Sequence, residues 1–221
     1  MKKFSERIRK KADPIWQDNF NHPFIKGLAD GTLPIESFKY YVLQDSYYLS
    51  HFARIQCAGG AKAEDFYTTS RMAIHAQGSY EAEMALHEKF SKMLNITTEE
   101  FENFIPAPSA YAYTSHLYRV AYNGNLGEII SALLPCYWVY LEIGDLLQGA
   151  TPEEEVYQEW IAAYGGDWFR DLVNEQIDRL DEIAETVTEK DRKKMEEHFL
   201  ISSHYEYAFW DMAYNREDWT R

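Results

Sequence analysis

Apolar and polar residues alternate along this chain with the period of an α-helix almost throughout. In the long segments, apolar side chains recur at spacings of three and four residues, which places them on one helical face. Few segments show the strict alternation or the Val, Ile and Thr enrichment of strands. Short breaks containing proline or glycine separate these segments. The pattern therefore predicts an all-α protein.

The breaks divide the chain into seven or more helices joined by tight turns. Six longer helices are expected at residues 34–63, 65–94, 109–122, 126–148, 167–187 and 189–215, with a short one after Pro152. Gly149 is a candidate C-cap and Thr188 a candidate N-cap, because these residue types suit those positions. No repeat, low-complexity tract or long linker occurs within residues 1–221. This organisation indicates a single-domain helical bundle.

Three of the apolar helix faces carry one reactive polar group in their middle. These groups are Asp45 within residues 38–52, Cys136 within 129–147 and Glu206 within 195–213. Burying a carboxylate costs several kcal/mol of desolvation free energy unless a partner compensates it. A single buried carboxylate is often satisfied by a nearby hydroxyl, arginine or backbone group. Two carboxylates and a thiol on three separate faces favour one shared polar pocket, because departures from the usual pattern cluster at functional sites.

Cys136 follows a proline inside an otherwise helical segment. Pro135 has no N–H to donate to the carbonyl of Ser131, so we expect the helix to kink and to open space beside the thiol. A lone cysteine on an apolar face is more often a small buried hydrophobic residue, and we interpret Cys57 in that way. The aromatic neighbours of Cys136 favour a chemical role for it.

Composition and charge narrow the classes of function. The formal net charge is −14, which disfavours binding to nucleic acid or to anionic lipid. The N-terminus lacks a signal peptide pattern, and no stretch approaches the roughly 18 apolar residues of a membrane helix. Two cysteines far apart do not form a disulfide framework, so the reducing cytoplasm is the expected compartment. The 17 tyrosines suit a pocket that stacks a planar polar ligand.

The sequence gives no support for a metal or a cofactor. None of the seven histidines has a glutamate three residues before it, as a di-iron bundle requires, and no HExxH occurs. The glycine-rich motifs of dinucleotide and P-loop proteins are also absent from the sequence. Cysteine–histidine chemistry of the protease type stays open, because its histidine can be distant in sequence.

Several motifs together resemble the thiaminase II (TenA) family over essentially the whole chain. They are His22-Pro23-Phe24, Asp30-Gly31-Thr32-Leu33-Pro34, Phe38, Tyr41, Gln44-Asp45, Tyr48-Leu49, the stretch from Leu134 to Gly144 around Cys136, and the stretch from Glu206 to Tyr214. The resemblance implies a haem-oxygenase-like helical bundle, commonly a homotetramer, that uses no cofactor. It also implies hydrolysis of thiamin or of 4-amino-5-aminomethyl-2-methylpyrimidine to hydroxymethylpyrimidine for thiamin salvage.

The resemblance also implies roles for individual residues. Cys136 resembles the nucleophile, Glu206 the acid/base, and Asp45 the carboxylate that binds the aminopyrimidine. The aromatic and hydrogen-bonding lining corresponds to Tyr48, Tyr113, Tyr140 and Tyr164. Because this chain keeps the cysteine, the thiol-dependent branch of the family is implied. From the apolar surroundings of Glu206 we expect a raised pKa that lets it donate a proton, whereas Asp45 is expected to be ionised.

Two other classes of function remain as alternatives. The first is a haem-binding protein on the same fold, which needs a histidine facing the pocket. His22 and His51 are the candidates, although a surface or capping role suits both better. The second is a non-catalytic helical regulator, because a fold by itself does not fix a function.

Overall fold

The computed structural model describes residues 3–219, apart from the side chains of residues 82, 83 and 87. Within that range every regular element is a helix, which confirms the all-α prediction. The helices are α1 (Phe4–Phe20), α2 (Pro23–Asp30), α3 (Ile35–Ala61), α4 (Phe66–Met93), α5 (Thr98–Glu102), α6 (Pro108–Asn123), α7 (Leu126–Leu146), α8 (Glu155–Tyr164), α9 (Asp167–Thr186) and α10 (Glu189–Asn215).

The six longer predicted helices agree with α3, α4, α6, α7, α9 and α10 to within a few residues, whereas α1 and α2 were not predicted; the predicted caps agree in part. Thr188 is the N-cap of α10, and its side chain accepts a hydrogen bond from the backbone N–H of Asp191. The prediction for Gly149 is wrong, because α7 ends at Leu146 and Leu147 occupies the C-cap. Gly149 lies beyond the cap with a φ of 88°, where the chain turns towards α8.

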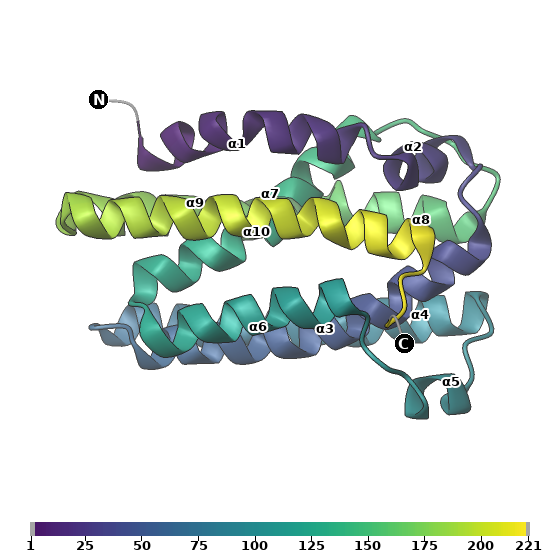
Figure 1. Ribbon diagram of the computed structural model, residues 1–221, viewed down its shortest axis with the longest axis horizontal. Coiled ribbons are helices and arrows are strands. Elements are labelled where there is room, and N and C mark those ends of the chain that lie inside the picture. Colours follow the sequence, from purple (N-terminus) through teal and green to yellow (C-terminus); the bar gives the residue numbers. More distant parts are fainter. Residues whose placement is uncertain (1–2, 220–221) are drawn as a thin grey trace.

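Helix α10 lies at the centre of the bundle. It contacts α1 and α2 on one side, α3 and α6 on the other, and α7 along its length. Figure 1 shows α1 above α10 and the pair α3 and α6 below it, with α5 at the lower edge of the bundle. Helix α3 packs against α4, and α7 packs against α9 and α8. Helices from both halves of the sequence therefore enclose the space between α3 and α7.

The core between these helices is unusually aromatic, and the N–H groups of its buried tryptophans are paired. Three tryptophans, Trp16, Trp160 and Trp210, are fully buried. Each indole N–H donates across to another helix, from Trp16 to Ser203, from Trp160 to Tyr41 and from Trp210 to Asn19. A buried indole N–H usually finds such a partner, since an unpaired donor is costly. These bonds fix α1, α3, α8 and α10 relative to one another.

Helix α7 is the inner helix of the bundle. Within residues 3–219 it is the one helix long and apolar enough to cross a membrane by length and composition, a property that the sequence analysis did not predict. In the structure 78% of its most apolar 18-residue window is buried inside the protein. Its apolar character is therefore explained by packing, because a helix surrounded by others is hydrophobic on all sides. The helical assignment continues through Pro135.

Helix α7 approaches the end of α8 very closely at Gly144. A Cβ atom at this position would lie 2.6 Å from both the carbonyl carbon and the carbonyl oxygen of Tyr164. Backbone atoms cannot move away as a flexible side chain would. Glycine at 144 therefore permits the contact that holds Tyr164 against α7.

We predict that Gly144→Ala destabilises the protein, because the added methyl group forces α7 and α8 apart. Overpacking of this kind costs about 1–3 kcal/mol, which corresponds to a fall in Tm of roughly 2–10 °C for a chain of this size. Gly166→Ala is the matched control, since a Cβ there meets no atom within 4 Å. Thermal unfolding followed by circular dichroism measures both variants, and equal Tm values would contradict the prediction.

Candidate active site

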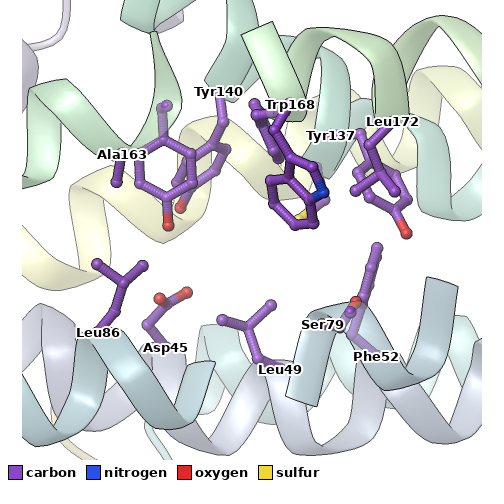
Figure 2. A pocket seen from close by; sticks show the side chains of 14 residues that line it. Asp45, Leu49, Phe52, Ser79, Leu86, Tyr137, Tyr140, Ala163, Trp168 and Leu172 are labelled. Carbon is purple, nitrogen blue, oxygen red and sulfur yellow. The ribbon is translucent and has the colours of Figure 1, made fainter. Parts of the chain in front are cut away.

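A cavity of about 90 Å³ lies between α3 and α4 on one side and α7, α8 and α9 on the other. This is well below the roughly 300 Å³ at which pockets for drug-sized ligands begin, so it suits a single small ring. Four of the residues singled out from the sequence line it: Asp45, Cys136, Tyr140 and Tyr164. Figure 2 shows Asp45 and Leu49 of α3 facing Tyr140 and Trp168 across the cavity.

The carboxyl group of Asp45 is held in this cavity wall by α3. Asp45 is 8% exposed, and this burial raises the pKa of its carboxyl group to about 7. The Tyr41 hydroxyl, which hydrogen-bonds to the carboxyl group, offsets part of this rise. From the sequence, Asp45 is expected to be ionised. Near neutral pH the carboxyl group is instead close to half protonated, because desolvation disfavours its charged form.

Glu206 reaches the same region from α10 and is only 2% exposed. The Tyr113 hydroxyl donates a 2.5 Å hydrogen bond to its Oε1 atom. Burial raises the pKa of Glu206 to about 8, the bond from Tyr113 lowers it in part, and the nearby Asp45 raises it further. The raised pKa expected from the apolar surroundings is therefore present, and the side chain is mostly protonated at neutral pH.

Tyr48, Tyr113 and Glu206 lie outside the immediate lining of the cavity, unlike the other expected site residues. They are nevertheless close to it. The rings of Tyr48 and Tyr113 lie 4.8 Å apart, and burial followed by the proximity of Cys136 raises the pKa of Tyr48. Cys136 likewise contributes to the raised pKa of Tyr113. The Cys136 thiol, which lines the cavity, therefore also lies near Tyr48 and Tyr113.

An aromatic wall closes the other side of the cavity. The Tyr140 ring lies 4.9 Å from the Tyr164 ring, which in turn lies 4.7 Å from the Trp160 ring. The hydroxyl oxygens of Tyr41 and Tyr140 are 3.3 Å apart. Tyr164 is the last residue of α8, and the close contact at Gly144 fixes its backbone. These rings provide flat apolar faces whose hydroxyl groups meet near Asp45.

Several lining residues were not identified from the sequence as part of a site. They are Leu49, Phe52, Gly78, Ser79, Leu86, Tyr137, Ala163, Trp168, Phe169 and Leu172. Ser79 lies on α4, outside the three apolar helix faces singled out from the sequence, and Trp168 at the start of α9 is 60% exposed. Neither residue interrupts an apolar helix face, so no feature of the sequence identified it as part of a site. Tyr137 was noted only as a neighbour of Cys136.

The remaining candidate residues lie away from the cavity. His22 is the N-cap of α2, and its Nδ1 accepts a 3.1 Å hydrogen bond from the N–H of Phe24. His51 Nδ1 lies 2.8 Å from the Tyr118 hydroxyl. Neither histidine lines the cavity, so neither is placed to hold a haem there. The prediction that Cys57 is buried is wrong, because its side chain points outward from α3 and is exposed.

The described side chains contain no metal-binding arrangement. Among them no group of three or more His, Cys, Asp or Glu residues lies close enough to hold a metal ion. The side chain of His87 falls outside the described residues.

The chain is similar to proteins of known name along nearly its whole length. It is 59% identical over 218 residues to the aminopyrimidine aminohydrolase of Bacillus subtilis strain 168, covering 99% of this chain and 92% of that protein. The solved structure of a TenA homologue from P. horikoshii OT3 superposes with a TM-score of 0.89 at 30% identity, covering 97% of this chain and 99% of that one.

A more distant structure identifies the fold. A domain with a haem oxygenase-like fold from Shewanella denitrificans superposes with a TM-score of 0.75 at 16% identity, covering 96% of this chain and 92% of that one. The TENA/THI-4/PQQC family itself matches residues 9–216. The protein therefore has the haem-oxygenase-like fold and belongs to the TENA/THI-4/PQQC family.

Proposed function

We propose that the protein is an aminopyrimidine aminohydrolase of thiamin salvage. It converts 4-amino-5-aminomethyl-2-methylpyrimidine to the hydroxymethyl compound, and it cleaves thiamin at the same methylene group. The observation that carries the proposal is the convergence of Cys136 and Asp45 on one small cavity, with the protonated Glu206 close behind. The 59% identical Bacillus subtilis relative bears the name of this activity. The cytoplasm is the proposed compartment.

The cavity binds the pyrimidine ring through Asp45 and the tyrosines. The exocyclic amino group of the ring donates to the Asp45 carboxylate, and this bond favours the ionised form of a carboxyl group whose pKa is about 7. The ring stacks on the Tyr140 side of the aromatic wall, where offset contacts between flat rings are favourable. Tyr164 and Tyr48 complete the surroundings of the ring. Orientation by these contacts brings the ring within reach of the thiol.

The reaction is an addition followed by an elimination. The Tyr113 hydroxyl donates a hydrogen bond to Oε1 of Glu206. The Oε2 oxygen therefore carries the proton that Glu206 donates to a ring nitrogen. Protonation makes the ring electrophilic, and the Cys136 sulfur adds to a ring carbon. The amine leaves from the methylene group with the proton that the thiol gave up on addition, and water then adds to that carbon and releases a proton. The sulfur is finally expelled and takes up that proton, while the ring nitrogen returns its proton to Glu206, which restores the aromatic ring, the thiol and the acid.

We predict that Cys136→Ala abolishes amine release while the protein stays folded. Loss of a covalent nucleophile lowers kcat by about a thousandfold or more. Cys57→Ala is the matched control, because that thiol is exposed on α3 and does not line the cavity. Release of ammonia from the aminomethylpyrimidine, and of the thiazole from thiamin, measures both variants. A folded Cys136→Ala protein with near-normal turnover would rule out the nucleophilic role.

We predict that the wild-type rate falls as pH rises through about 8, because Glu206 loses its proton there. Glu206→Gln removes the titrating group, so kcat drops by about a hundredfold or more and this alkaline limb disappears. Glu128→Gln is the control, since Glu128 is a buried carboxylate whose Oε2 lies 3.3 Å from His198 Nε2, away from the cavity. Rates measured from pH 5 to 10 test this assignment. Retention of the limb in Glu206→Gln would count against it.

We also propose that the protein assembles as a homotetramer. Large apolar side chains are exposed on two helices that both pack against α3, with Phe66 89% and Tyr67 68% exposed on α4 and Tyr122 87% exposed on α6. Contact between copies would remove such surface from water. Multi-angle light scattering should give about four times the chain mass of 26.0 kDa. Tyr122→Glu should shift the assembly towards smaller species, and a monomeric wild type would refute the proposal.

A further inference from the structure

Tyr137, the residue after Cys136 on α7, connects the cavity to a row of buried polar groups. Its ring lines the cavity, and its hydroxyl is tied to two other helices. The Gln56 side chain of α3 donates to the hydroxyl, and Nδ1 of His75 on α4 lies 3.3 Å from it. Figure 2 shows Tyr137 near Phe52 and Ser79 at one end of the cavity, away from Asp45. This end has no role in the mechanism proposed above.

The row continues from His75 to an ion pair between α4 and α9. Nε2 of His75 lies 3.4 Å from Oε2 of Glu175. Arg71, one turn before His75, grips both carboxylate oxygens of Glu175 with two hydrogen bonds, one of them 2.8 Å long. Arg179 adds a third contact at 3.3 Å. Two guanidinium groups therefore fix the carboxylate that faces His75.

The chemistry of these groups sets the direction of every bond in the row. The hydrogen bond from Arg71 is the main cause that lowers the pKa of Glu175 to about 2, so the carboxylate can only accept. His75 is completely buried, which lowers its pKa and leaves it neutral with a single N–H. Nε2 has no hydrogen-bond partner among the described residues but lies 3.4 Å from the Glu175 carboxylate, which favours the proton on Nε2, so we assign Nδ1 as the acceptor. The Tyr137 hydroxyl then donates to Nδ1 and accepts from Gln56.

This orientation matters because α7 is weakened immediately before the thiol. Pro135 has no N–H, so the carbonyl of Ser131 loses its usual helical donor. The Ser131 hydroxyl itself bonds to the carbonyl of Gly127, one turn earlier. The backbone that carries Cys136 therefore depends on contacts made after the proline. The Tyr137 hydroxyl supplies such a contact to both α3 and α4.

We propose that Tyr137 is a positioning residue, held by Gln56 and by the His75–Glu175–Arg71 row, that sets where the Cys136 sulfur meets the substrate. The inference rests on the proposed function of Cys136 as the nucleophile. An error of about 1 Å in the placement of a reacting group can cost a hundredfold in rate. Loss of the Tyr137 bonds should therefore affect turnover more than substrate binding, because Asp45 and the aromatic wall remain in place.

The first test compares two buried tyrosine hydroxyls. Tyr137→Phe removes the bonds to Gln56 and His75 but keeps the ring. We expect kcat for the aminomethylpyrimidine to fall about tenfold while KM changes by less than about twofold. Tyr157→Phe is the matched control, because this buried hydroxyl on α8 donates a 2.7 Å bond to the carbonyl of Leu33, outside the cavity lining. An equal loss of kcat in both variants would overturn the proposal.

The second test asks whether His75 acts as a hydrogen-bond acceptor. His75→Leu removes the acceptor, and we expect kcat to fall about as far as in Tyr137→Phe. His75→Asn places an amide oxygen close to the position of Nδ1, and it should restore most of the lost rate. A His75→Asn protein as impaired as His75→Leu would show that packing alone is at work, which would overturn the proposal.

The third test does not depend on enzymatic activity. In a Cys57→Ser background, iodoacetamide reacts with Cys136 alone, and mass spectrometry gives the rate. We expect Tyr137→Phe to change that rate about threefold or more, and Tyr157→Phe to leave it unchanged, because only the first alters thiol placement. An unchanged rate in Tyr137→Phe would overturn the proposal. Absence of amine release by the wild type would refute the proposed function. The alkylation rate would still show whether Tyr137 sets the position of the Cys136 thiol.

Discussion

Burying two carboxyl groups in an aromatic interior is the constraint that dominates this structure. Removing an ionised carboxylate from water costs several kcal/mol unless charges or hydrogen bonds compensate. Asp45 and Glu206 receive tyrosine hydroxyls and no basic partner at an ion-pair distance among the described side chains. Each therefore holds its proton to an unusually high pH. The fold keeps these pKa values high because both carboxyl groups lie on helices that pack against aromatic side chains.

The tyrosine-rich composition follows from the same constraint. A phenol ring packs as an apolar body and still brings a hydroxyl group to a buried carboxyl group. Tyr41 meets Asp45 in this way, and Tyr113 meets Glu206. Tryptophan N–H groups bond across the surrounding helices and hold the rings in fixed positions. The same aromatic side chains thus account both for the rigidity of the core and for the raised pKa values of the two carboxyl groups.

The sequence predicted the helices well because their apolar faces are long and regular. Asp45, Cys136 and Glu206 could be identified because each interrupts such a face, and all three lie in or near one cavity. Cys57 could not be assigned correctly. It is one residue beyond the buried Gln56, and a helix turns about 100° per residue, so this small side chain points to solvent. Ser79 and Trp168 were missed because their place in the site depends on how α4 and α9 pack.

The electrostatic link between Asp45 and Glu206 couples ligand binding to proton occupancy. The negative charge of an ionised Asp45 raises the pKa of Glu206. A ligand that donates hydrogen bonds to Asp45 favours that ionised state and thereby strengthens the hold of Glu206 on its own proton. By linkage, the filled cavity retains the acid over a wider pH range than the empty one. In the proposed mechanism, occupancy of the cavity thereby favours the protonated form of the group that donates the proton.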